Sequence, residues 1–415
     1  MSLNVLIAPS GFKESLGADE IADCIAAGVL RVVPNANIRK VPLVDGGEGF
    51  TKALVAATGG TIHEIEVMGP MGKPIQSHFG FLGGTSNKTA ALEMSAAAGL
   101  RLVPRDVRDP QVTTTYGVGE LIKAALDRGA ERILVGCGDS GTNDGGAGMA
   151  QALGAQLLDD QHQPIGLGGH SLHQLQHISL KDLDPRLAQI QIDVACNWHN
   201  ILCGDRGVAR VFGPQKGASP AVVASLETAL ERYAETIERD LGLDVRSMNG
   251  GGASGGLGAG LFALLGANLY PRYDIVMEYL ELDRWLPESD LVITAEGCID
   301  FQTPRGKIPV EVAKRAKCFN LPVIVIAGSI GQDAAINLEH GIDAFTTILE
   351  TPCELAEAIE QTATLVTNAT ERMLRTIALG YCLSRREPNL LQKLNSSISG
   401  DQKIISDINN LLILE

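Results

Sequence analysis

The sequence predicts an α/β protein built around parallel β-sheets. Short β-branched runs alternate with helical patterns at both ends of the chain, and this alternation is typical of parallel sheets. The 415 residues include 47 glycines and only 4% aromatic residues, so aliphatic side chains must form the core between many tight turns. At this length two domains are expected.

The two ends of the chain show the same order of elements. A strand at 5–8, a helix at 18–32 and a strand at 38–43 open the sequence. Near the C-terminus, strands at 291–294, 323–327 and 344–348 are separated by helices at 310–317 and 333–339. Because both ends follow βαβ order, they can share one parallel sheet.

The middle of the chain has a different texture, with glycine clusters, a polar connector at 159–169 and helical stretches at 113–128 and 220–241. We interpret it as an inserted domain. The predicted division is residues 1–85 plus 286–384 for the first domain and 86–285 for the inserted α/β domain. Residues 385–415 form a polar tail that ends in an apolar segment, for which a docking helix and a disordered end both stay open.

The charge balance narrows the classes of partner. Lys and Arg number 34 against 49 Asp and Glu, a formal charge of −15, which disfavours nucleic acid and anionic membranes. The eight cysteines are scattered without metal-ligand spacing and are typical of reduced thiols. The N-terminus lacks the features of a signal peptide, and no apolar run is long enough to span a bilayer. We expect a cytoplasmic protein acting on small molecules, and a homodimer stays open.

Two loops that follow predicted N-terminal strands carry candidate site residues. Ser10 and Lys13 lie where a parallel sheet binds ligands, although a capped helix start also explains them. Asp45 and Glu48 flank a glycine pair, where a carboxylate can hold Mg²⁺ or take a proton from a hydroxyl. Ordinary turn chemistry explains this pattern equally well.

A glycine-rich run at 136–148 has six glycines in thirteen residues between a predicted strand at 133–135 and a helix at 147–153. This layout is typical of a phosphate cradle, with candidate residues Gly138, Ser140, Thr142, Asn143 and Asp144. The run also contains G-x-G-x-x-G, so an NAD(P)-dependent oxidoreductase is the main alternative. Further glycines and polar residues before the helix argue against that alternative.

Two later segments complete the candidate set. The stretch 250–260 has seven glycines in eleven residues, and Gly252, Gly255 and Gly256 either approach a ligand or let a helix pack tightly. The loop predicted after the strand at 291–294 concentrates charged and polar groups, of which the candidates are Glu296, Asp300, Gln302, Arg305 and Lys307.

Seven motifs in order resemble the glycerate kinase type I family. They are Ala8–Leu16, Asp45–Gly49, Thr113–Ile122, Gly138–Met149, Gly213–Ala218, Gly250–Gly260 and Thr294–Pro309. The resemblance covers about residues 4–380 and implies an ATP- and Mg²⁺-dependent transfer of phosphate to D-glycerate, with O2 favoured over O3. It also implies a flavodoxin-like parallel-sheet domain interrupted by a second, inserted α/β domain.

The residues that we expect to act in such a transfer fall into two groups. Asp45 and Asp300 are candidates to act on the glycerate hydroxyl, and Asp45 is also the candidate metal ligand. Lys13 and Lys307 are expected to bind phosphate or the glycerate carboxylate, because an acidic chain needs local cations to attract anions. Ser10, Glu48, Glu296, Gln302 and Arg305 complete the expected substrate contacts.

The chain departs from the family pattern at three places. Asn197 stands where the family has an aspartate, Cys298 stands where it has an arginine, and the tail after Arg385 has no counterpart. If the missing arginine clamps an anion, Arg305 in the same segment is the nearest replacement. A catalytically weakened ligand-binding homologue is therefore a further alternative.

Overall fold

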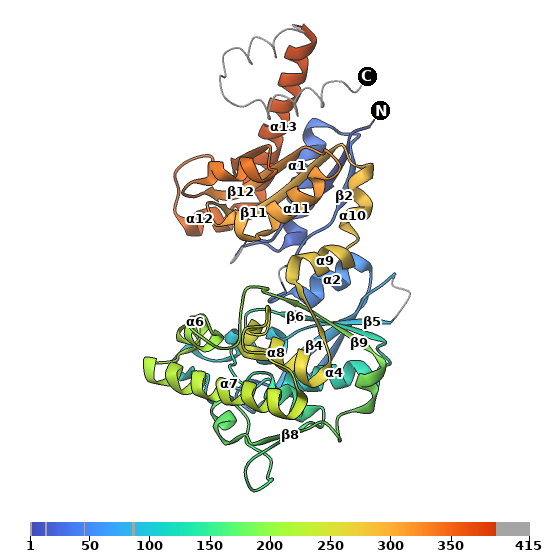
Figure 1. Cartoon of the computed structure of the whole chain (residues 1–415). Coiled ribbons are helices and arrows are strands. Elements are labelled where there is room, and N and C mark those ends of the chain that lie inside the picture. The colour runs from blue at the N-terminus through green and yellow to red at the C-terminus, as the bar shows by residue number, and fades with distance from the viewer. Residues whose placement is uncertain (1, 13–14, 45, 85–87, 387–415) are drawn as a thin grey trace. The chain divides into compact units, whose positions relative to one another are not determined.

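The computed structural model describes residues 2–12, 15–44, 46–84 and 88–386 (Figure 1). Candidate residues Lys13 and Asp45, and nearly all of the predicted tail, lie outside the described residues. The chain divides into two compact units, of which unit 1 comprises Met1–Leu43 and Met277–Glu415 and unit 2 comprises Val44–Val276. In the described part of the chain, no helix is long and apolar enough to cross a membrane.

Unit 1 contains a parallel sheet with the strand order β13-β12-β11-β1-β2. We number the five strands of this unit by their order in the chain and read the sheet from its β2 edge. The strand order is then 2-1-3-4-5, which is the flavodoxin-like order. The predicted flavodoxin-like α/β class is confirmed. The strands are β1 (Asn4–Ile7), β2 (Asn37–Lys40), β11 (Leu291–Ile299), β12 (Val323–Ile330) and β13 (Ala344–Thr347).

Helices of unit 1 form where the sequence supplies both an apolar stripe and a cap. In α1 (Ala18–Val32), Ile21, Ile25 and Val29 recur at helical spacing and are fully buried. The Glu20 carboxylate accepts a hydrogen bond of 2.9 Å from the Gly17 amide at the start of the helix. The remaining helices are α10 (Leu282–Trp285), α11 (Ile308–Lys317), α12 (Leu355–Glu360), α13 (Thr362–Arg386) and the short 3-10 helices η6 (Leu286–Glu288), η7 (Thr303–Arg305) and η8 (Ala334–His340). Helix α9 (Arg272–Tyr279) spans the junction between the units.

Strand β11 is longer than predicted. The sequence predicts a loop from Thr294 onward, whereas the structure continues the strand to Ile299 because Cys298 and Ile299 pair with Ser329 and Ile330 of β12. Glu296 and Cys298 therefore lie in a strand rather than in a loop. A second difference concerns the segment 333–339, which is predicted as an α-helix and forms the 3-10 helix η8.

Unit 2 contains a mixed sheet with the order β10-β9-β6-β5-β4-β3. The neighbours from β5 to β10 are parallel, whereas β3 and β4 form an antiparallel pair and β4 is antiparallel to β5. Residues 44–85 thus belong to unit 2, whereas the sequence assigns them to the first domain, because β3 and β4 extend this sheet. The strands are β3 (Thr61–Met68), β4 (Pro74–Phe81), β5 (Thr89–Glu93), β6 (Arg132–Cys137), β9 (Gln191–Cys196) and β10 (Asn268–Pro271), with β7 (Gln156–Leu158) and β8 (His177–Ser179) in a separate pair.

The helices of unit 2 include the predicted α7 (Pro220–Leu241), which matches its predicted bounds. Ser219 caps its first turn by accepting from the Val222 amide at 3.3 Å, and Gly242 ends it with a φ of 73°. The others are α2 (Phe50–Thr58), α3 (Ser95–Ala98), α4 (Tyr116–Asp127), α5 (Ala147–Ala152), α6 (Val208–Phe212), α8 (Ala253–Leu265) and the 3-10 helices η1 (Leu100–Leu102), η2 (Arg105–Val107), η3 (Gly169–Gln174), η4 (Pro185–Gln189) and η5 (Pro214–Lys216).

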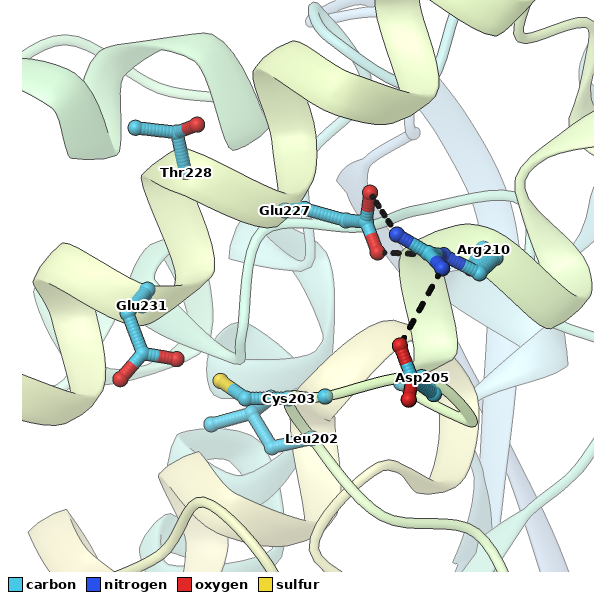
Figure 2. Close-up of a pocket in the computed structure, with 9 residues that line it drawn as sticks. Leu202, Cys203, Asp205, Arg210, Glu227, Thr228 and Glu231 are labelled. Carbon is cyan, nitrogen blue, oxygen red and sulfur yellow. Dashed lines mark hydrogen bonds and ion pairs between the residues drawn. The ribbon is translucent and has the colours of Figure 1, made fainter.

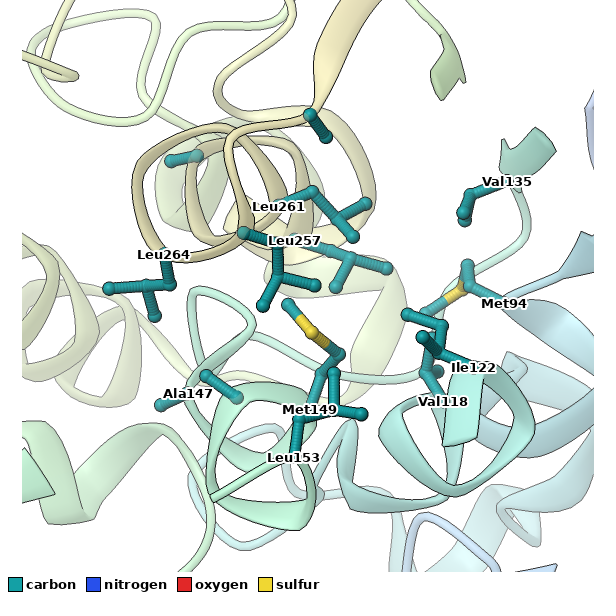
Figure 3. Close-up of a cluster of buried hydrophobic side chains, with 14 of the residues drawn as sticks. Met94, Val118, Ile122, Val135, Ala147, Met149, Leu153, Leu257, Leu261 and Leu264 are labelled. Carbon is teal, nitrogen blue, oxygen red and sulfur yellow. The ribbon is translucent and has the colours of Figure 1, made fainter. Parts of the chain in front are cut away.

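The core of unit 2 lies beneath its glycine-rich segments. Leu257 and Leu261 of α8 gather with Met149 of α5 and with Val118 and Ile122 of α4 (Figure 3). All five side chains are fully buried. Both glycine-rich segments lead into helices of this core, which fixes their position within unit 2.

Candidate functional site

Unit 1 places candidate residues at the point where its strand order reverses, between β1 and β11. In open parallel sheets, ligands bind outside the carboxyl ends of the strands at this point. Ser10 follows β1, and its Oγ donates a 2.8 Å hydrogen bond to the Ala295 carbonyl of β11. Ser10 thus holds the two strand ends together with its side chain.

Glu296, Asp300 and Lys307 form one ion-pair cluster after the middle of β11. Lys307 Nζ lies 3.3 Å from Glu296 Oε2 and 3.0 Å from Asp300 Oδ1, and it donates to the Cys298 carbonyl at 3.0 Å. Thr303 Oγ1 donates to Glu296 Oε1 at 2.7 Å. One cation between two carboxylates makes this a polar centre with a fixed geometry.

The two carboxylates of this cluster have different environments. Burial raises the pKa of Glu296, and the Thr303 hydroxyl and Lys307 only partly oppose that effect. Burial also acts to raise the pKa of Asp300, but hydrogen bonds from Lys307 and the Gln302 amide hold it below its ordinary value. Burial would lower the pKa of Lys307, yet the two carboxylates raise it. Asp300 therefore remains ionised at neutral pH while Lys307 remains charged.

The other candidates in this segment are more exposed. The Gln302 side chain is exposed, and only the backbone N–H of this residue donates to Asp300 Oδ1, at 2.9 Å. Arg305 is also exposed, and its guanidinium lies 5.5 Å from the centre of the Phe301 ring. Neither contact fixes these side chains as firmly as the cluster fixes Lys307.

In unit 2, Asp144 anchors the glycine-rich run that follows β6. Its carboxylate is fully buried and accepts hydrogen bonds from the Thr115 amide at 2.8 Å and from the Thr115 hydroxyl at 2.9 Å. It also accepts from the amides of Gly146 and Gly148 at 3.2 and 3.3 Å. Asp144 is therefore fully used in holding the loop, and its capture of Thr115 explains why α4 begins at Tyr116 rather than at the predicted residue 113.

Residues 46–49 of the second motif lie against the same glycine-rich run. A Cβ on Gly138 would come within 2.6 Å of Gly47 Cα, so this position requires glycine for close approach. The Glu48 amide donates to Asp139 Oδ2 at 3.0 Å, and the Glu48 carboxylate pairs with Arg101. Two motifs that the sequence predicts separately thus form one surface of unit 2.

Lys216 is the functional candidate that the sequence-based set lacks. Its side chain is 2% exposed, and its Nζ donates to Ser140 Oγ at 2.8 Å and to the Thr142 carbonyl at 2.7 Å. Both partners are neutral. Burial lowers the pKa of Lys216 to about 7, although Asp144 opposes this shift. The sequence analysis finds the Gly213–Ala218 motif but does not select Lys216 from it. A lysine between a helix end and a turn is normally solvated.

Several polar atoms beside Lys216 have no partner among the described residues. They are Thr142 Oγ1 and both ends of the Asn143 side-chain amide, all of them closed off from solvent. Buried polar groups are rarely left unpaired, because each costs about 1–3 kcal/mol of stability. The group formed by Lys216, Ser140, Thr142 and Asn143, which we term the lysine cage, therefore combines a buried lysine with spare hydrogen-bonding capacity on the loop that it contacts.

The glycines at 250–260 pack against this loop. A Cβ on Gly255 would come within 1.9 Å of the Thr142 carbonyl oxygen, and one on Gly256 within 2.8 Å of Gly145 Cα. A Cβ on Gly252 would meet the Ile201 carbonyl at 2.0 Å. The tight-packing interpretation of these three glycines therefore holds in the structure, since backbone rather than open space faces each of them.

The loop geometry differs from that of a dinucleotide fingerprint. In that motif the helix begins among the glycines, whereas α5 begins at Ala147, after the left-handed pair Gly145 and Gly146. The G-x-G-x-x-G match at 136–141 is therefore a pattern in sequence without the corresponding structure.

A hollow of about 370 Å³ in unit 2 lies between the segment 202–207, α6 and α7. Its cation is already paired, because Arg210 donates to both oxygens of Glu227 and to Asp205 (Figure 2). Glu231, also in its lining, pairs with Arg246. These ion pairs leave no charged group to recruit an anionic ligand.

Comparisons with known proteins agree with these arrangements. The sequence profile of the glycerate kinase family matches residues 5–378. A glycerate kinase from Haemophilus influenzae is 46% identical over 379 residues, which cover 91% of this chain and 100% of that protein. The glycerate 2-kinase of Escherichia coli K12 is 46% identical over 378 residues, which cover 91% of this chain and 99% of that protein.

A crystal structure of a proposed glycerate kinase 2 from Salmonella typhimurium LT2 resembles the fold with a TM-score of 0.81 at 46% identity. The match covers 91% of this chain and 99% of that one. Family profile, sequence relatives and solved structure agree over nearly the whole chain, and the chain therefore belongs to the glycerate kinase family.

Proposed function

We propose that this chain transfers the γ-phosphoryl group of ATP to a hydroxyl of D-glycerate, with O2 as the favoured acceptor, in the presence of Mg²⁺. Its relatives include proteins named glycerate kinase and glycerate 2-kinase. The observation that carries the proposal is the lysine cage, since a buried cation beside unpaired amide and hydroxyl groups suits a phosphate.

The lysine cage supplies phosphate binding in this proposal. A phosphate oxygen and a buried water are the two groups of suitable size and polarity for its unpaired atoms. We propose the phosphate, because the hydrogen-bond partners of the Lys216 ammonium among the described residues are neutral, and a water would add no counter-charge. Ser140, Thr142 and Asn143 would donate around it, while Asp144, Gly138, Gly252, Gly255 and Gly256 hold the loop in place.

The cluster of unit 1 supplies the acceptor chemistry. Asp300 is a carboxylate that stays ionised and can take the proton from the glycerate hydroxyl, and Lys307 beside it can bind the glycerate carboxylate or a phosphate. Ser10, Glu296, Gln302 and Arg305 are proposed substrate contacts, together with Glu48 in unit 2. Lys13 is proposed to bind phosphate or the glycerate carboxylate, and Asp45 to act on the glycerate hydroxyl or hold Mg²⁺.

The proposed Mg²⁺ would take most of its ligands from the phosphates of ATP rather than from the protein. No group of three or more His, Cys, Asp or Glu side chains placed to hold a metal occurs among the described residues. Mg²⁺ in phosphotransferases commonly uses one or two carboxylates plus substrate phosphates. Asp45 is the carboxylate proposed for this purpose, and the ion would neutralise charge on the phosphates.

The direct test is ADP release on adding D-glycerate and ATP, followed by NMR of the product. We expect glycerate-dependent ADP release and a phosphorus resonance coupled to the C2 proton. Coupling to the C3 protons would move the acceptor to O3. No glycerate-dependent ADP release, with NADH binding instead, would favour the oxidoreductase, and no turnover with retained ATP binding would identify a weakened homologue.

Replacing Lys307 with methionine is expected to raise the KM for glycerate or ATP by about tenfold, the lower end of the value of a charge-assisted hydrogen bond. The variant should also melt at a lower temperature, because Glu296 is buried and loses its cation. Lys317→Met, which removes an exposed pair with Asp343 from the same helix, is the matched control and should keep its KM. Equal KM values for Lys307→Met and wild type would make Lys307 a structural cation only.

The KM for ATP is expected to rise with pH above 7, by up to about tenfold per pH unit. Burial lowers the pKa of Lys216 to about 7, so its charged form prevails below pH 7 and its neutral form above it. Only the charged form attracts phosphate, so bound phosphate raises the pKa of Lys216, and KM should keep rising until the pH reaches that raised pKa. KM should be measured from pH 6 to pH 9 in wild type and in Lys216→Met. The same slope in both proteins would assign the pH dependence to other groups.

A further inference from the structure

Helix α13 packs on α1 over its first part only. Thr367 Oγ1 donates to the Cys24 carbonyl at 3.1 Å, and Arg31 in the last turn of α1 pairs with Glu371 at 3.1 Å. A Cβ on Gly28 would come within 2.6 Å of the Thr367 carbonyl oxygen, so the two backbones are close there. Because α1 ends at Val32, the part of α13 beyond Leu374 extends past its partner.

The end of α13 is exposed and rich in large apolar residues. Every residue of 375–383 is exposed. These residues belong to the red end of α13 in Figure 1. The exposed fractions are 45% for Ile377, 60% for Leu379, 56% for Tyr381 and 43% for Leu383. Exposed apolar surface of this extent on one helix marks a site where another segment packs.

Ile377 and Tyr381 continue the stripe by which α13 packs on α1. Val366, Thr370 and Leu374 are buried and precede them at spacings of three and four residues, so all five lie on one face of the helix. We term Ile377 and Tyr381 the apolar stripe. It begins where the cover supplied by α1 ends.

The apolar stripe lies at the C-terminal end of the region of this chain that matches its relatives. The family profile ends at residue 378, and the match to the Haemophilus influenzae protein already spans its whole length in 379 residues. Ile377 lies just inside that profile and Tyr381 just after it, and the 29 residues 387–415 lie wholly beyond it. What covers the stripe is thus to be sought in this chain's own addition.

The sequence after α13 contains a segment with a matching apolar face. Apolar residues at 404, 405, 408, 411 and 412 follow helical spacing, and polar residues at 406, 407, 409 and 410 fall on the other side. Pro388 two residues after α13 disfavours continuation of the helix and favours a turn of the chain. The 17 residues 387–403 can span about 56 Å when extended, far more than the distance of about 6 Å between Ile377 and Tyr381 along a helix axis.

Charge also matches between the two segments. Residues 375–386 carry three arginines and no carboxylate, and of the three Arg375 pairs with Glu371 in the same helix. Residues 401–415 carry Asp401, Asp407 and Glu415 against one lysine. Opposite net charges favour their association, and attachment through one linker raises the effective concentration into the millimolar range.

We propose that residues 404–412 of the same chain dock on the apolar stripe of α13 and continue the packing that α1 provides on its first part. Docking within one chain is favoured over docking of a second copy because the linker is long enough and costs no loss of free translation. This inference is independent of the proposed catalytic activity.

The test is amide hydrogen exchange of peptides covering 375–386 in the full chain and in Ile408→Asp. The aspartate places a charge in the proposed apolar face, so exchange of these amides should accelerate by at least about tenfold. Asn410→Asp adds the same charge on the opposite side of the segment and should leave exchange unchanged. A chain ending at Gln402 should match Ile408→Asp, and exchange in the full chain should not change on dilution.

Three results would overturn the proposal. Rapid exchange of 375–386 in the full chain would mean that nothing covers the stripe. Unchanged protection in both Ile408→Asp and the shortened chain would mean that another segment covers it. Loss of protection on dilution, with a mass by light scattering that falls when the chain ends at Gln402, would assign the stripe to a second copy.

Discussion

Replacing Lys216 with methionine is expected to lower kcat/KM for ATP by about a thousandfold while making the protein more stable. The activity loss is the upper range for removing one preorganised donor to developing charge. The stability gain follows because an ammonium with only neutral partners is taken out of a buried place and replaced by an apolar side chain of similar length. A lysine with a purely structural role would show the opposite change in stability.

Two measurements separate these explanations. Thermal melting of Lys216→Met should show a raised midpoint at pH 7, and the exposed Lys123→Met in α4 should show neither change. The lowered pKa of Lys216 means that the unfolded chain binds more protons above pH 7, so wild-type stability should rise from about pH 7 towards the ordinary lysine pKa. A variant that loses stability while keeping its KM for ATP would show that the lysine cage serves the fold alone.

Replacing Asp300 with asparagine is expected to lower kcat by at least about a hundredfold, the usual scale for removal of a general base. The asparagine keeps the shape of the side chain and can still accept from the Gln302 amide and from Lys307. It cannot take a proton at neutral pH. The loss should therefore appear in kcat, with the melting temperature little changed.

Asp333→Asn is the matched control for this change. Asp333 precedes η8 in the same unit, is exposed and has a φ of 52°, a conformation that asparagine also adopts readily. Its kcat should equal that of wild type. Asp45→Asn is expected to match Asp300→Asn, and full turnover in both would leave the reaction without either proposed carboxylate.

The sequence predicted the elements whose causes are local. Helices α1 and α7 match their predicted bounds because apolar spacing, a cap and a terminating residue all lie within the segment. The flavodoxin-like order of unit 1 followed from the family resemblance and from βαβ alternation at both ends. The proximity of Glu296, Asp300 and Lys307 could also be predicted, because these residues are near in sequence.

The features that the sequence did not predict depend on contacts between residues distant in sequence. The extension of β11 to Ile299 requires pairing with β12, which no local pattern in 294–299 indicates. The assignment of 44–85 to unit 2 depends on the addition of β3 and β4 to a sheet completed by β10. Burial of Lys216 arises from the packing of its turn on the loop at 140–142, so its sequence neighbours give no sign of it.

The pairing of β1 with β11 has a consequence for synthesis of the chain. Val5 pairs with Leu291, so the strand made first must wait for its neighbour until nearly three hundred residues have left the ribosome. Unit 2 is continuous in sequence and can complete its sheet during that interval. Until then β1 can pair only with β2, so the amino-terminal βαβ segment keeps an open strand edge longer than any other part of the nascent chain, and it is where chaperone contact during translation would matter most.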